Sequence, residues 1–143
     1  MKLSSVVAGA ISAIAVIAIV LLIAGVRFER PLSTQGPALY NPADEITVNG
    51  VVQEVQTFSC PVSEGEEGGH LMLKTAERTV RVHLAPGRIL RSQNITFAPG
   101  DQLSVVGARF RFRGSDDVIA REVTRGQEAY VLRDHTGKLL VVQ

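Results

Sequence analysis

Apolar residues follow two different patterns along the chain. Residues 6–26 form an apolar run whose only clearly polar member is Ser12. A helix rises about 1.5 Å per residue, so a run of this length spans roughly 30 Å, the thickness of a bilayer's hydrocarbon core. From Ile46 onward, apolar and polar residues alternate instead, which is typical of half-buried β-strands. The pattern therefore predicts a membrane-spanning helix followed by an all-β domain.

Alternation in the second part predicts a series of short strands. Gly50 indicates a bulge or bend in the first strand, and Gly107 indicates a point where a later strand changes the face that it buries. Pro86–Asn94 is predicted to be a short helix, because Pro86 suits a first helical turn and Ile89 and Leu90 are apolar. The predicted strands are 46–58, 70–75, 80–84, 103–112, 118–123, 129–132 and 139–142.

The second and third strands are predicted to form a hairpin. Pairing their apolar faces sets Leu71 opposite Leu84 and Met72 opposite His83, with Glu77-Arg78 as a two-residue turn. Neither turn residue is the Asn or Gly that a tight turn prefers, so a loop of three or four residues is the alternative.

Three strands, a helix and two further strands follow the order of the five-stranded oligonucleotide/oligosaccharide-binding barrel, the OB-fold. We expect this barrel with an added C-terminal hairpin, and a small sandwich is the alternative. The predicted organisation is a transmembrane signal anchor or cleaved signal peptide (1–27), a Pro/Gly-containing tether (28–42) and an OB-fold-like domain (43–143).

The membrane segment also predicts location. Ile23-Ala24-Gly25 is a poor cleavage site, which favours an uncleaved anchor over a signal peptide. Lys2 on one side and Arg27 and Arg30 on the other nearly balance the positive-inside rule. We expect a single-pass protein of the cell membrane whose C-terminal domain is extracytoplasmic, in the periplasm.

Three segments, ITVNGVVQEV, HLMLKTAERTVRVHL and FAPGDQLSVVGARFRFRGSDDVIAREV, resemble small exported bacterial OB-fold proteins. The architecture is similar to that of the cytochrome c maturation haem chaperone, which has an N-terminal anchor and a periplasmic OB-fold. That family attaches haem through a histidine just after its last barrel strand. The corresponding stretch here, Thr124–Tyr130, contains no histidine, so the resemblance does not extend to haem attachment.

Composition excludes several functions. Cys60 is the only cysteine, which rules out an intramolecular disulfide and a CxxCH haem attachment. The net charge of +1 and the absence of tryptophan argue against nucleic-acid binding. The chain contains no GxSxG, HExxH or P-loop motif, so we predict no enzyme.

Two surfaces are candidate sites. His70, Met72 and His83 lie on one face of the predicted hairpin, and Cys60 lies in a loop that could reach them; imidazole, thioether and thiolate suit copper or another soft metal ion. Exposed polar residues without a ligand are the alternative. A basic surface is predicted from the arginines that alternate with Phe110 and Phe112 and from a like-charged hairpin pair: Arg109, Arg111, Arg113, Lys74 and Arg81.

The sequence thus predicts a membrane-anchored, non-catalytic OB-fold binding module without a cofactor, whose basic surface engages an envelope protein or an anionic ligand. The alternative is a metal- or haem-handling protein of the periplasm. The sequence sets no oligomeric state.

Overall fold

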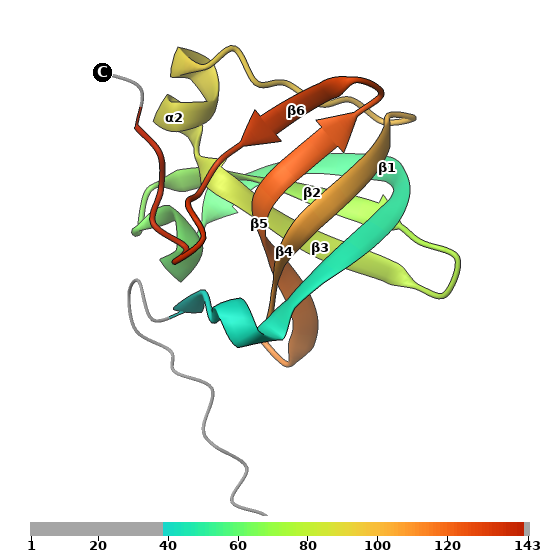
Figure 1. Ribbon diagram of the computed structural model, residues 1–143, viewed down its shortest axis with the longest axis horizontal. Coiled ribbons are helices and arrows are strands. Elements are labelled where there is room, and N and C mark those ends of the chain that lie inside the picture. Colours follow the sequence, from blue (N-terminus) through green and yellow to red (C-terminus); the bar gives the residue numbers. More distant parts are fainter. Residues whose placement is uncertain (1–38, 142–143) are drawn as a thin grey trace, which may run out of the picture. The chain divides into compact units, whose positions relative to one another are not determined.

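The computed structural model describes residues 39–141, which are mostly β-structure with one short α-helix (Figure 1). The helix α2 spans Gly87–Ser92, and two 3-10 turns, η2 (Pro42–Asp44) and η3 (Pro61–Ser63), flank the first strand. The all-β prediction with one short helix is confirmed. The strands are β1 (Glu45–Ser59), β2 (Glu67–Lys74), β3 (Thr79–Pro86), β4 (Gln102–Phe112), β5 (Ser115–Arg125) and β6 (Glu128–Val131).

The strand pairing closes a barrel. The sheet order is β3-β2-β1-β4-β5-β6, and a short parallel pairing of β3 with β5 joins Val82 to Val118 and His83 to Ile119. The long strand β1 pairs with β4 through its first half and with β2 through its second half. Five strands that close in this order, with a helix between the third and fourth, form an OB-like barrel. The barrel prediction is therefore preferred over the sandwich.

Two glycines allow the close approaches on which this closure depends. A Cβ at Gly50 would lie 2.4 Å from the carbonyl oxygen of Lys74, where β1 passes from β4 to β2. The register shift in β1 falls slightly later than predicted, between Val52 and Glu54. A Cβ at Gly107 would lie 2.2 Å from the carbonyl oxygen of Ile119, so a side chain at either position is excluded.

The strands bury two separate apolar clusters. The barrel core contains Leu71, Val82 and Val105, together with Ile89 from α2. Beyond the register shift at Gly107, the apolar residues of β4 point to a second cluster, as predicted. This second cluster contains Ala108, Phe110 and Phe112 of β4 together with Ile119, Val62, Cys60 and Tyr40. Leu39 and Phe58 pack against this second cluster. The candidate site lies within it.

The predicted hairpin register was wrong by two residues. His70 pairs with His83, Leu71 with Val82 and Met72 with Arg81. The connection is the longer alternative, a four-residue loop, because Lys74 pairs with Thr79. The hydroxyl of Thr75 organises this loop by donating to the carbonyl of Arg78 at 2.7 Å. The sequence has no Asn or Gly here to form a tight two-residue turn. A longer loop held by the Thr75 side chain takes its place.

The C-terminal hairpin is only partly formed. The strand predicted at 129–132 is present as β6, but it pairs with β5. The strand predicted at 139–142 is reduced, within the described residues, to a single bridge between Arg133 and Leu139. The side chain of Asp134 accepts hydrogen bonds from the backbone of Thr136 and Lys138, which forms the turn between these two segments.

No helix among residues 39–141 is long and apolar enough to cross a membrane. The segment predicted to do so, 6–26, lies outside the described residues.

Leu71 is fully buried in the barrel core, whereas Leu140 is 38% exposed. We expect Leu71→Ala to lower the free energy of unfolding by about 2–5 kcal/mol, through lost burial and the cavity left behind. The matched control, Leu140→Ala, should change it by less than about 0.5 kcal/mol. Urea unfolding of the full-length chain measures both values. Equal effects of the two substitutions would contradict the assigned core.

Candidate metal centre

The two histidines of the β2–β3 hairpin lie on its face away from the barrel core. They alternate with Leu71 and Val82, which point into that core, and the register sets His70 directly beside His83. The alternative, that these are exposed polar residues, is wrong for the two histidines, because each is only 1% exposed. The second apolar cluster, contributed by β4, β5 and the loop after β1, covers the hairpin here.

Cys60 completes a three-residue cluster. The chain leaves β1 at Ser59 and turns at once through η3, which returns the thiol to the hairpin. The Sγ atom lies 3.2 Å from Nε2 of His70 and 3.4 Å from Nδ1 of His83. The three potential ligand atoms all lie within 4.8 Å of one another, and all three residues are buried. Three of the four residues predicted as metal ligands are thus brought together.

The loop that carries Cys60 is held by Ser63. The hydroxyl of Ser63 accepts a hydrogen bond from the backbone N–H of Cys60 at 3.2 Å, and it lies 3.6 Å from Sγ. Ser63 is itself buried. These contacts give the thiol a defined position although it lies outside the strands.

Asp117 orients His83 and was missed by the sequence analysis. Its Oδ2 lies 2.7 Å from Nε2 of His83, and both side chains are buried. A carboxylate only accepts hydrogen bonds, so Nε2 donates to Asp117, while Nδ1 faces the sulfur and donates to the thiolate when it carries a proton as well. By its sequence alone, the pair Asp116-Asp117 beside Gly114 is typical of a hairpin tip. A signal was present, because Asp117 precedes Val118 in the same alternating strand and shares a face with Ile119.

The histidines alter the acidity of the thiol. Burial of Cys60 acts to raise its pKa, but hydrogen bonds from His70, His83 and Ser63 outweigh burial and lower the pKa from 9.0 to about 5. Cys60 is therefore a thiolate at neutral pH. Because the folded pKa lies below the unfolded one, the thiolate stabilises the fold fully above the unfolded pKa, and this stabilisation is lost as the pH falls through about 5.

Aromatic rings enclose the cluster. Phe58 stacks on His70, with ring centroids 3.6 Å apart and an interplanar angle of 9°. Phe110 and Phe112 pack edge-on to His83 at 4.8 and 4.9 Å. Among the described residues, Nδ1 of His70 has no hydrogen-bond partner, so stacking on Phe58 holds this ring.

The remaining predicted site residues lie outside the cluster. Met72 is partly buried and lies beside Arg81, two pairs along the hairpin from the histidines. Arg81 reaches back toward the site, because its Nη1 lies 3.5 Å from Oδ2 of Asp117. The like-charged pairing of Lys74 with Arg81 was wrong, because the register sets Lys74 beside Thr79.

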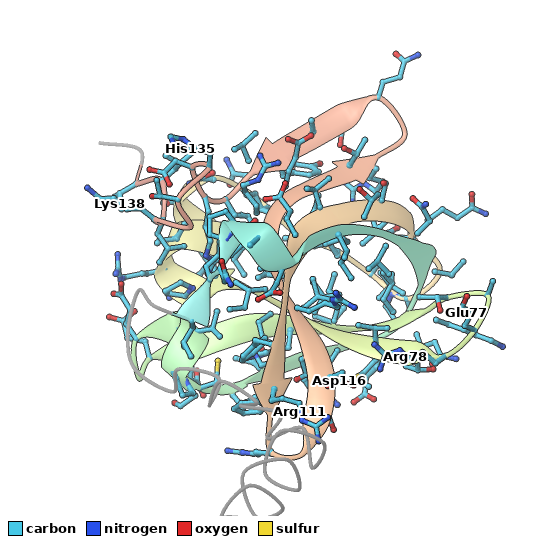
Figure 2. All side chains as sticks on the ribbon, turned by 60° about the horizontal axis from the view of Figure 1, so that its bottom comes forward. Glu77, Arg78, Arg111, Asp116, His135 and Lys138 are labelled. Atoms are coloured by element: carbon cyan, nitrogen blue, oxygen red, sulfur yellow. The ribbon has the colours of Figure 1, made fainter. Side chains whose placement is uncertain are left out.

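Arginines alternate on the exposed face of β4, as predicted. Arg109 and Arg111 are exposed, while Phe110 and Phe112 belong to the second cluster. Figure 2 shows Arg111 and Asp116 side by side near the tip of the β4–β5 hairpin, where they form an ion pair of 2.9 Å. Arg113, in the turn, lies over the ring of Phe112 with its guanidinium carbon 4.8 Å from the ring centroid.

The cluster permits two kinds of chemistry. A thiolate, an imidazole and a carboxylate in series are the elements of a cysteine nucleophile with its base. Two imidazoles around one thiolate are equally the ligand set of a metal ion. Burial of the sulfur beneath Phe58 and Phe112 leaves little room for a substrate to reach it, whereas a single ion needs only the space between the three ligand atoms.

The family is established by sequence comparison. A model of the MamS/MamX magnetosome protein family matches residues 44–130, which is more than half of the chain. The chain therefore belongs to the MamS/MamX magnetosome protein family. No curated protein matches the sequence. These comparisons carry no evidence for the resemblance to the haem chaperone.

One solved structure shows only a partial likeness. A chain from the crystal structure of the S. pombe Stn1-ten1 complex is similar, with 18% sequence identity and a TM-score of 0.44. The match covers 59% of this chain and 59% of that chain, so the protein spans less than two thirds of that neighbour's length. The assignment of an OB-like barrel rests on the strand order described above.

The ultraviolet absorbance of the Cys60 thiolate tests the cluster in the metal-free protein. We expect this absorbance to titrate near pH 5 and the midpoint to rise in His83→Gln, because one hydrogen bond to the sulfur is lost. His135 is exposed, so His135→Gln is the matched control and should leave the midpoint unchanged. A midpoint near 9 in the unmodified protein would refute the described hydrogen bonding.

Proposed function

We propose that this domain is a non-catalytic copper-binding module, with Cys60, His70 and His83 as the ligands. The observation that carries the proposal is the position of one buried sulfur within 3.2 and 3.4 Å of two imidazole nitrogens. A trigonal set of two histidines and one cysteine is characteristic of copper sites that transfer electrons.

The distances support a single ion between the three atoms. Metal–sulfur bonds near 2.3 Å and metal–nitrogen bonds near 2.0–2.1 Å, opened to tetrahedral or trigonal angles, set sulfur and nitrogen about 3.5–3.8 Å apart. The observed separations are a few tenths of an ångström shorter. A small outward shift of Cys60, which lies on a loop, would accommodate the ion.

Charge favours the monovalent state of the metal. The cluster contains the thiolate of Cys60 and the carboxylate of Asp117, against the guanidinium of Arg81. One positive charge makes this set neutral, whereas a divalent ion leaves it positive. Uncompensated charge is costly in a buried site, and thiolate ligands prefer Cu(I). We therefore propose Cu(I) as the resting ion.

The placement of the module is also a proposal. The apolar run at 6–26 supports a membrane tether, and the following domain would then be extracytoplasmic. The chain belongs to a magnetosome protein family, which supports a role in a magnetosome. Tethering raises the local concentration of the metal site for partners at the same membrane.

Metal titration of the full-length chain in a neutral detergent tests the proposal. With a colorimetric Cu(I) chelator as competitor, we expect one Cu(I) per chain. Cys60→Ser should abolish this binding, and Asp117→Asn should weaken it by about 10- to 100-fold, because Asp117 orients a ligand. His135→Gln should bind like the unmodified protein. Undiminished binding in Cys60→Ser, or tighter binding of Zn(II) or Fe(II), would refute the copper site.

A second candidate function is capture of an acidic envelope partner on the exposed face of β4. Two arginines of the predicted basic surface already form ion pairs within the domain, Arg81 with Asp117 and Arg111 with Asp116. Within the described residues, Arg109 and Arg113 make no ion pair. They are the groups best able to meet a partner's carboxylates.

Charge reversal tests this surface separately from the metal site. We expect Arg109→Glu to reduce the set of proteins crosslinked to the chain in native membranes, since rim charges govern association. It should leave copper stoichiometry unchanged. Lys138→Glu, which makes the same change at a distant exposed site, is the control. An identical crosslinked set in Arg109→Glu and the unmodified chain would rule out this partner surface.

A further inference from the structure

A pocket beside the Cys60 loop contains a buried cation. This pocket has a volume of about 310 Å³. Its walls are largely apolar and come from the segments before β1, after β1 and after β6 and from β5: Leu39, Tyr40, Pro61, Val62, Leu139 and Ile119. Arg133 also lines it, with Glu64 and Lys138.

Arg133 is the one buried arginine or lysine among the described residues, with only 3% of its surface exposed. Its Nη1 donates two hydrogen bonds, to the backbone carbonyls of Leu84 and Ala120, each 2.5 Å long. These bonds fix the guanidinium against β3 and β5. They do not neutralise it, because carbonyl groups carry no net charge.

Within residues 39–141, no carboxylate lies within ion-pairing distance of Arg133. Glu64, the one acidic side chain that lines the pocket, is instead 3.7 Å from Arg88. The hydroxyl of Tyr40 is also committed, since it donates to Glu45. Burial lowers the pKa of Arg133 to about 10, in keeping with a cation that lacks a counter-anion.

The unused donors of Arg133 are arranged for a carboxylate. Nε and Nη2 have no hydrogen-bond partner among the described residues, and Arg133 lines the pocket. This edge of a guanidinium presents two parallel N–H groups that match the two oxygens of a carboxylate. A buried, rigidly held cation without a partner is costly unless an anion joins it.

We propose that this pocket binds a small monocarboxylate with an apolar body, whose carboxylate pairs with Nε and Nη2 of Arg133. The apolar walls would contact the body of the ligand. A single charge on the ligand balances the single buried guanidinium, while a doubly charged phosphate would face an excess of negative charge beside Glu64. The volume lies at the lower end of the range for small-molecule pockets. This site stands independently of the copper site.

Hexanoate is a suitable probe, with hexanamide as its neutral counterpart of the same shape. Calorimetry on the full-length chain in a neutral, sugar-based detergent should give saturable hexanoate binding with a dissociation constant on the order of millimolar. Hexanamide should bind at least about tenfold more weakly, because it carries no charge for Arg133. Equal binding of the two compounds would overturn the proposal.

Two variants locate the binding. Arg133→Gln removes the cation and should reduce hexanoate affinity to that of hexanamide. Arg133 also hydrogen-bonds to two strands, so its replacement can destabilise the fold. Leu139→Trp is a second variant that keeps the guanidinium; its larger side chain fills the pocket and should abolish hexanoate binding. Lys74→Ala, an exposed change elsewhere, should bind normally. Undiminished hexanoate binding in Leu139→Trp would overturn the proposal whether or not Arg133→Gln folds, and neither result depends on copper.

Discussion

The structure depends on a chain of hydrogen bonds that links Asp117, His83 and Cys60 inside an apolar cluster. Each of these groups would be costly to bury alone, and each is stabilised by the next. Asp117 fixes the proton of His83, His83 faces the sulfur, and His70 approaches the same sulfur from the neighbouring strand. The cluster is thus a polar centre whose geometry is set by contacts among its own members.

The topology of the barrel assembles this centre. The parallel pairing of β3 with β5 carries Asp117 to His83, and the antiparallel pairing of β2 with β3 carries His70 to it. The face of the second and third strands, between the loops after β1 and β4, is where OB-folds commonly bind their ligands. Here β4 and the β1 loop close over that face with Phe112 and Cys60. A face that OB-folds commonly leave open is thereby buried around the two histidines.

Local patterns in the sequence were sufficient for the strand positions and for the barrel. Alternation located all five barrel strands, and Gly107 correctly marked the change of buried face, because both features reflect the immediate backbone. The predicted hairpin register was wrong because matching the apolar faces of two strands permits several registers that differ by two residues. The four-residue loop, held by Thr75, selects among them. The burial of His83 could not be predicted, since Phe110 and Phe112, which pack on it, arrive from β4, nearly thirty positions later.

The candidate ligands were partly predictable, because local alternation also shows which residues share a strand face. His70 and His83 share a strand face that alternation reveals, and Cys60 was close enough in sequence to be considered. Asp117 and Arg133 depend on long-range pairing, because their roles come from the β3–β5 contact and from the carbonyls of Leu84 and Ala120. In both cases the useful signal was a charged residue within or beside an apolar strand.

X-ray absorption at the copper edge of the Cu(I)-loaded full-length chain tests the central claim most directly, because it counts and identifies the ligand atoms. One sulfur and two imidazole nitrogens around each copper are the predicted coordination. A first coordination sphere that lacks sulfur, or that is built from oxygen atoms alone, would contradict the account.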